Sequence, residues 1–158
     1  MFFELNDPSL LRTQAYIGGR WSGADSGSVT TISNPATGKQ IVFVPNVGAA
    51  ETRRAIDAAK AALPAWRQRS AKDRAQVLRR WFDLMIANQD DLALILTSEQ
   101  GKPLLEAKGE VLYGASFVEW FNEEAKRVYG ETTPANTTDK RIHVLREPVG
   151  VCAAITPW

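Results

Sequence analysis

The sequence Val-Gly-Val-Cys-Ala-Ala-Ile at residues 149–155 decides the fold class, because it is a short, unbroken run of small and apolar residues. Pro148 precedes this run, and Thr156 and Pro157 follow it. A run of this length between turn residues predicts a strand over Val149–Ile155 that is buried on both faces. Such strands lie inside parallel sheets, which need crossover helices to cover them. We therefore expect an α/β fold, and we expect the 158 residues of the chain to be the opening part of a larger protein.

Residues 1–47 carry the signals of short β-hairpins. Gly18-Gly19 separates two short segments of strand character, and glycine readily adopts the positive φ angles of a two-residue hairpin turn. The sequence Asn-Pro-Ala-Thr-Gly at residues 34–38 is a further turn before the apolar segment at residues 40–44. We expect a pair of hairpins that is too small to be stable alone.

Residues 48–130 change to helical spacing and predict four helices. Pro64 is expected to end or kink the first helix, and Ser70 is suited to cap the second. Gly101 is suited to end the third helix, and Gly130 the fourth. The four predicted helices cover residues 51–66, the segment after Ser70 that includes residues 77–86, residues 90–100, and residues 103–129.

The polar segment at residues 131–139 is expected to be a loop. Residues 140–146 then alternate around Ile142 and Val144, which is typical of a half-exposed strand. A strand of this kind is available to pair with another subunit or with the first hairpins.

The composition excludes several classes of protein. With 158 residues, 44% hydrophobic and 23% charged, the chain resembles one soluble globular domain. The apolar runs are too short to span a bilayer, and the amino terminus lacks the features of a signal peptide. A single cysteine excludes an internal disulfide framework. We therefore expect a cytoplasmic protein with no membrane partner.

Nine basic residues but only two acidic ones lie between Arg53 and Arg80. This local excess leaves a nucleic-acid-binding surface open as an alternative. The formal net charge of the whole chain is only +1, however, so the rest of the sequence cancels the excess. We interpret the basic segment as a solvated helical face and expect no nucleic-acid partner.

The residues alone identify no reaction. His143 is the single histidine and lies in an alternating strand, where a surface or packing role is the commoner one. Cys152 is expected to be buried in the strand at residues 149–155, where a thiol is unreactive. The sequence also lacks the spacing of a metal site.

Several motifs together resemble the aldehyde dehydrogenase superfamily. The most specific is Glu-Gln-Gly-Lys-Pro at residues 99–103. Further segments resemble the same family in the same order, and others are most similar to its bacterial NAD(P)-dependent succinate-semialdehyde dehydrogenase branch. The first group comprises residues 17–21, 34–38, 147–151 and 155–158, and the second comprises residues 5–7, 90–92, 117–121 and 126–130.

The resemblance implies an arrangement of domains and sites. Residues 1–130 would be the amino-terminal strands and helices of the cofactor-binding domain. Residues 131–148 would be an oligomerisation hairpin, and residues 149–158 the truncated first strand of a Rossmann-like sheet. Tyr113 and Phe117 would line the substrate tunnel. The residues expected to contact NAD or NADP are Ile155, Thr156, Pro157 and Trp158.

The resemblance also implies a reaction, the oxidation of an aldehyde to a carboxylic acid through a cysteine thiohemiacetal. The family's nucleophile lies in sequence beyond these 158 residues, and Cys152 is not at its position. The chain is therefore expected to be an inactive amino-terminal segment of a homo-oligomeric succinate-semialdehyde dehydrogenase. A non-catalytic oligomerisation or regulatory module derived from such an enzyme is the alternative.

Overall fold

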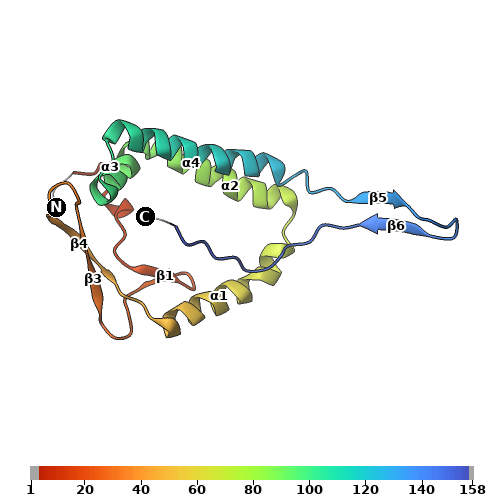
Figure 1. The fold of residues 1–158 in the computed structure, drawn as a ribbon, viewed down its shortest axis with the longest axis horizontal. Helices are drawn as coiled ribbons and strands as arrows, with labels where there is room; N and C mark the ends of the chain where they lie inside the picture. The colour runs from red at the N-terminus through yellow and green to blue at the C-terminus, as the bar shows by residue number, and fades with distance from the viewer. Residues whose placement is uncertain (1–3, 157–158) are drawn as a thin grey trace.

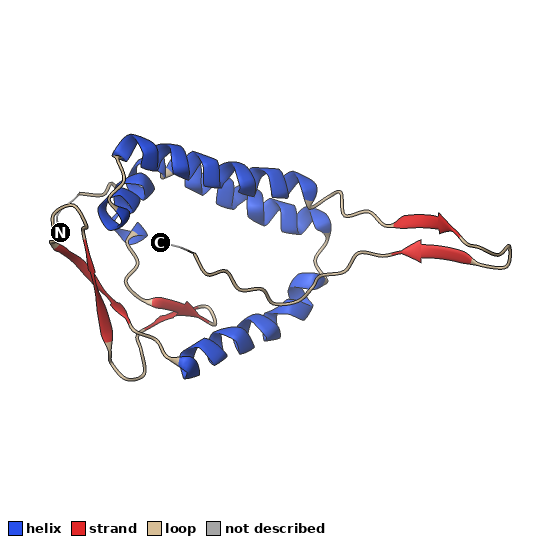
Figure 2. Ribbon diagram, in the orientation of Figure 1, coloured by secondary structure: helices blue, strands red, loops and turns tan. Residues whose placement is uncertain are grey.

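A computed structural model describes residues 4–156. Within that range the fold is α/β, as expected, with four α-helices and three separate two-stranded antiparallel sheets. Helices α2, α3 and α4 lie together, α1 lies apart from them, and the β5–β6 hairpin projects from the helical end (Figures 1 and 2). The strands are β1 (Ala15–Ile17), β2 (Arg20–Ser22), β3 (Val29–Ser33), β4 (Gln40–Pro45), β5 (Glu131–Pro134) and β6 (Arg141–Val144). The helices are α1 (Ala49–Arg67), α2 (Ala71–Ala87), α3 (Gln89–Gln100) and α4 (Leu104–Glu124), after a short 3-10 helix at Pro8–Leu10.

The two predicted amino-terminal hairpins are confirmed. Gly18 and Gly19 have φ angles of 58° and 82°, and they connect β1 to β2. On these strands the Tyr16 and Trp21 rings pack across the hairpin with centroids 4.9 Å apart. In the second hairpin, the Asn34 side chain accepts a hydrogen bond from the backbone N–H of Ala36 at 2.9 Å, which closes the turn between β3 and β4.

Capping residues decide where α1 and α2 begin. Glu51 accepts hydrogen bonds from the backbone N–H groups of Gly48 and Asp25, at 3.1 and 2.8 Å. This buried carboxylate therefore holds both the first turn of α1 and the preceding loop. Ser70 caps α2, as predicted, by accepting from the N–H of Asp73 at 3.1 Å. Pro64 does not end α1, which continues to Arg67, because proline removes only one hydrogen bond so near the helix end.

The fourth helix is shorter than predicted. It ends at Glu124, because Lys126 and Arg127 already bond to carbonyls only three residues back, which tightens the chain into a turn. Gly130, predicted to close the helix, has another role. A Cβ atom at Gly130 would collide with the carbonyl oxygen of Val144, so glycine permits the two legs of the last hairpin to approach.

The predicted loop at residues 131–139 is partly wrong, because Glu131–Pro134 forms β5 and pairs with β6. Both faces of β5 are exposed. Its threonine-rich sequence therefore lacks the apolar alternation that identifies a half-buried strand. Residues 131–148 do contain a hairpin, and its role in oligomerisation stays a prediction.

The segment at residues 149–155 is not a strand in the described chain. Val149 is 94% exposed and Ile155 is fully exposed, and Cys152 is also exposed, so the predicted burial on both faces is wrong. A central strand needs hydrogen-bonded neighbours on both sides, and residues 4–156 place none beside this segment. Its assignment to a cofactor-binding sheet stays a prediction.

A cluster of small buried residues lies between α3 and α4. Ala93 and Ala107 have no exposed area, Val111 is 9% exposed, and Leu92 and Leu96 pack around them. Among the described residues, no large side chain is completely buried. The apolar interior of residues 4–156 is therefore small for a chain of this length.

The amino terminus is attached to the start of α3 by Asp91. One oxygen of this buried carboxylate accepts from the backbone and side-chain N–H groups of Asn6, both at 3.0 Å. The other accepts from the backbone N–H of Asp7 at 2.7 Å. The hydrogen bonds from Asp7 and Asn6 stabilise the ionised carboxylate and hold the pKa of Asp91 below its usual range.

We predict that Asp91→Asn lowers the free energy of unfolding at pH 7 and reduces the further loss of stability as the pH falls. Asparagine replaces one of the two accepting oxygens with an NH2 group, so it cannot accept from both Asn6 and Asp7. Because the folded-state pKa of Asp91 is lowered, its stabilising contribution is present above the ordinary pKa of 3.8 and is lost as pH falls through the lower value. Urea unfolding at a series of pH values from 7 to about 3 measures the free energy of unfolding of the parent chain and of the variant. Asp90→Asn is the control, because the Asp90 side chain is 71% exposed; an equal effect of both substitutions would contradict the prediction.

Gly101 brings the end of α3 against the turn between β3 and β4. Its φ angle is 87°, the left-handed conformation of a helix C-cap, as predicted from the sequence. A Cβ atom at this position would lie only 2.7 Å from Pro35 Cγ. Two of the motifs that carry the family resemblance, at residues 99–103 and 34–38, therefore meet at this glycine.

We predict that Gly101→Ala lowers the free energy of unfolding by about 1–3 kcal/mol, because it combines a disfavoured φ angle with a clash. Gly109→Ala is the matched control. Gly109 lies within α4 and a Cβ there meets nothing within 4 Å, so alanine should stabilise the chain by about 0.5–1 kcal/mol. Urea unfolding of both variants tests the difference in sign, and a stabilising Gly101→Ala would refute the prediction.

Candidate functional site

One side of α4 presents a continuous group of exposed aromatic side chains. Tyr113 is 66% exposed and Phe117 48% exposed, and their rings meet edge to face with centroids 4.9 Å apart. One turn further on, Trp120 and Phe121 are 64% and 58% exposed. The structure therefore brings together the two predicted tunnel residues and adds two aromatic neighbours that the sequence analysis did not select.

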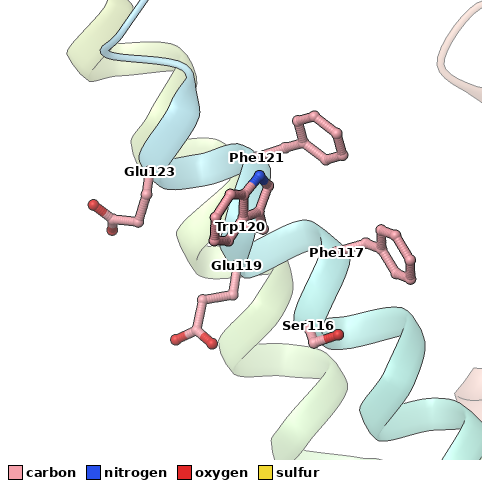
Figure 3. A pocket seen from close by; sticks show the side chains of 6 residues that line it. All are labelled: Ser116, Phe117, Glu119, Trp120, Phe121 and Glu123. Atoms are coloured by element: carbon pink, nitrogen blue, oxygen red, sulfur yellow. The ribbon is translucent and has the colours of Figure 1, made fainter.

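The carboxyl-terminal half of α4 lines an open groove of about 790 Å³. Figure 3 shows the Phe117 and Phe121 rings on one side of the helix and the carboxylates of Glu119 and Glu123 on the other, with Trp120 between them. Tyr113 contacts Phe117 but does not line the groove itself. The groove therefore combines an apolar wall with an acidic edge, which suits an apolar or basic occupant more than an anion.

Glu119 also connects α4 to α2. Its carboxylate lies 3.5 Å from Arg79, which forms a second ion pair with Asp83 at 3.1 Å. Both pairs are about half exposed, so they contribute little to stability. They do place the acidic edge of the groove beside α2.

Two of the four predicted cofactor residues lie in the exposed carboxyl-terminal segment of the described chain. Ile155 and Thr156 are described and exposed, whereas Pro157 and Trp158 lie outside the described residues. In Figure 1 this segment returns from the hairpin toward the end of the molecule that carries β1. Contact with NAD or NADP stays a prediction for all four residues.

The contacts of Cys152 and His143 are local. Cys152 Sγ donates a long hydrogen bond to the Gly150 carbonyl oxygen at 3.8 Å. His143 is in β6, where its Nδ1 lies 3.3 Å from the Thr132 hydroxyl across the hairpin. These contacts do not form a nucleophile–base pair. Within residues 4–156, no group of acidic, histidine or cysteine side chains is arranged to hold a metal ion.

Lys102 and Glu110 form an ion pair between the residues that follow α3 and the first half of α4. The sequence analysis noticed Lys102 only as part of a motif. Its partner lies eight residues away, across a helix start, where the periodicity of a single element gives no signal. The structure therefore shows an ion pair of Lys102 that the sequence pattern did not predict.

The basic residues of α1 and α2 are partly neutralised. Arg54 makes two hydrogen bonds of 2.7 Å to Asp25, which hold the pKa of that carboxyl below its usual range. Arg67 lies 3.2 Å from Glu147, beyond the hairpin. These pairs favour the interpretation as a solvated helical face over a surface for nucleic acid, which stays a prediction.

None of the helices in residues 4–156 combines the length and the apolar character that crossing a membrane requires.

Comparison with known proteins gives consistent results. A profile described as "Aldehyde dehydrogenase family" matches residues 21–158. The chain is 63% identical to glutarate-semialdehyde dehydrogenase of Pseudomonas aeruginosa and 57% identical to succinate-semialdehyde dehydrogenase [NADP(+)] of Escherichia coli. Each alignment covers 155 residues, which are 98% of this chain and 32% of the relative. The chain thus spans about a third of the length of these relatives.

Solved structures agree with the sequence comparison. The crystal structure of succinate-semialdehyde dehydrogenase from Burkholderia pseudomallei superposes with a TM-score of 0.92 at 62% identity. The match covers 95% of this chain and 31% of that protein. The described fold is therefore similar to part of a larger α/β enzyme.

Proposed function

The chain belongs to the aldehyde dehydrogenase family, and on this basis we propose that it forms the amino-terminal part of an NAD(P)+-dependent semialdehyde dehydrogenase. Such an enzyme oxidises an aldehyde to a carboxylic acid. The observation that carries the proposal is the agreement of fold and sequence over almost the whole chain, with a TM-score of 0.92 at 62% identity. Similarity at this level extends beyond the general fold to individual motifs.

The proposed substrates are aldehydes with an acidic group at the opposite end. The relatives are named for glutarate semialdehyde, succinate semialdehyde and, in Pseudomonas putida, 3-sulfolactaldehyde at 57% identity. Each of these molecules combines an aldehyde with a carboxylate or sulfonate. Succinate semialdehyde is the substrate that the sequence motifs favour, and glutarate semialdehyde is the nearest alternative.

In this proposal the aromatic side of α4, and not the acidic edge of its groove, contributes to the substrate path. Tyr113 and Phe117 present aromatic surface that can pack against the short hydrocarbon part of the substrate and exclude water from it. Neither ring carries a charge that could bind the acidic end of the substrate. Their proposed role is therefore to limit the width of the path and to orient the aldehyde.

Residues 155–158 are proposed to contact the nicotinamide side of NAD or NADP. Ile155 suits this role, because it is fully exposed and offers apolar surface against which a flat ring can pack. When bound, the cofactor would accept the hydride of the aldehyde. The Escherichia coli relative is named for NADP(+), and other structures of similar fold contain NAD+.

The chain by itself is proposed to lack dehydrogenase activity. Its single cysteine, Cys152, has no general base among its contacts. The catalytic groups of the family, its nucleophile included, would come from sequence other than residues 4–156. Cytoplasmic location and association of several subunits are further parts of the proposal.

One observation favours the alternative function, a non-catalytic oligomerisation module. The β5–β6 hairpin projects from the helices, and every residue of its two strands is exposed (Figure 1). Ile142 and Val144 lie on one face, whereas Thr132 and His143 lie on the other. An exposed apolar strand face of this kind is suited to pair with a second copy of the chain.

We predict that a chimera of this chain and the Escherichia coli relative oxidises succinate semialdehyde with NADP+. The chain would replace the 155 matching residues, and kcat/KM should remain within about tenfold of the parent. In this chimera, Tyr113→Ala should lower kcat/KM, because it widens the substrate path. Tyr129→Ala is the matched control, since Tyr129 is also 66% exposed but lies beyond α4. A folded, assembled chimera without activity would disprove the proposed function.

We predict that Ile142→Lys weakens self-association of the chain by about tenfold or more, because it places a charge on the apolar face of the hairpin. Thr132→Lys, on the opposite face, is the control and should leave association nearly unchanged. Sedimentation equilibrium over a range of concentrations measures both. Equal association of the two variants would show that this face of the hairpin does not form the contact.

A further inference from the structure

A pocket of about 530 Å³ lies where the end of α1 meets the chain that returns from the β5–β6 hairpin (Figure 1). Its charged lining residues are Arg67, Arg74, Arg146 and Glu147, so the set has three positive charges and one negative charge. Helix α1 ends and helix α2 begins beside the pocket, so the two helix dipoles oppose each other there. The side chains therefore determine the sign of the local potential, which is positive.

Arg74 is held in place by the end of α1. Its Nη1 donates to the carbonyl oxygen of Arg69 at 2.5 Å and to that of Arg67 at 3.5 Å. A guanidinium group has five N–H donors, and no described residue accepts from Nε or Nη2 of Arg74. Arg74 therefore retains donors for a further acceptor, and because its side chain is already ordered, the entropic cost of binding is lower.

Arg67 and Arg146 complete the basic lining of the pocket. Arg67 uses one nitrogen, Nη2, in its ion pair with Glu147 at 3.2 Å. Arg146 donates from Nε to the carbonyl oxygen of Tyr129 at 2.9 Å, and its Nη2 lies 3.5 Å from the carboxylate of Glu131. The side chains of both ion pairs are more than half exposed, so water screens these pairs and an incoming anion can replace the carboxylate.

Trp66 gives the pocket an apolar side. It is 41% exposed, and Cζ of Arg69 lies 5.6 Å from the centroid of its ring. Leu63 and Pro148 also line the pocket. An anion with a short hydrocarbon part can therefore bind through both its charge and its apolar atoms, whereas inorganic phosphate would bind through its charge alone.

We propose that this pocket is a binding site for an oxyanion, a phosphate or a carboxylate group, and that the anion takes the place of Glu147 beside Arg67. Guanidinium groups bind such anions well, because two of their N–H donors match the spacing of two oxygen atoms. The pocket shares no lining residue with the aromatic groove of α4, so the site does not depend on the proposed function. Because Glu147 directly precedes residues 148–156, binding would release the start of the carboxyl-terminal segment from α1.

The test is a titration of the whole chain with inorganic phosphate and, separately, with succinate, at constant ionic strength. The backbone N–H resonances of Trp66, Arg67 and Gly150 report binding, because these residues line the pocket. We expect shifts at these resonances that saturate with at least one of the two anions, and the anion with the lower Kd identifies the preferred group. Shifts that do not saturate with either anion, or that spread evenly over the chain, would overturn the proposal.

Substitution of the two members of the Arg67–Glu147 pair gives opposite expectations for the Kd. Glu147→Gln removes the competing carboxylate and should lower the Kd by about threefold or more, whereas Arg67→Gln should raise it by about tenfold. Asp25→Asn and Arg54→Gln are the matched controls, because Arg54 also lies on α1 and its ion pair with Asp25 is similarly exposed. Both controls should leave the Kd nearly unchanged, and circular dichroism establishes that each variant is folded. Equal Kd values in folded Glu147→Gln and Arg67→Gln would show that the pair is only structural and would overturn the proposal.

Discussion

The close approach of α3 and α4 through Ala93 and Ala107 is the constraint on which the arrangement of this chain depends. Both alanines have no exposed area, and larger side chains there would force the helices apart. Helix α3 then connects the remaining parts. Asp91 at its start holds the amino terminus, and Gly101 at its end allows the turn between β3 and β4 to pack against it.

Where segments distant in sequence meet, buried carboxylates and not a large apolar core hold them together. Glu51 and Asp91 are each only 4% exposed, and each accepts backbone N–H groups from a segment distant in sequence. Loop N–H groups have no partners in a helix or sheet, so a carboxylate that accepts two of them removes the cost of leaving them unpaired. The hydrogen bonds also lower the pKa of both carboxyl groups, which keeps them ionised near neutral pH.

Local signals in the sequence predicted local structure well. The Gly18-Gly19 turn, the Ser70 cap and the Gly101 cap follow from properties of single residues, and the four helices follow from apolar spacing. Contacts between distant residues were not predictable in this way. The bond between Asp7 and Asp91 joins residues 84 positions apart, and nothing in either segment specifies the other.

The two errors in strand prediction have a common cause, because sequence patterns report burial and not hydrogen-bond partners. Glu131–Pro134 has a strand partner but no buried face, so it lacked the expected alternation. Residues 149–155 have the apolar composition of a buried strand but no strand partner within the described chain. In the candidate site, the place of the long helix in the family resemblance selected Tyr113 and Phe117, but only the folded structure revealed their mutual contact.

The exposed apolar surface connects the fold to the proposed function. Val149 and Ile155 are almost entirely exposed, and the aromatic side chains of α4 are 48% to 66% exposed. Large exposed apolar surface marks sites of interaction with further protein. The chain spans about a third of the length of its relatives. In an enzyme of that length, a catalytic domain packed on this surface would bury it. The aromatic flank would then become one wall of an enclosed path.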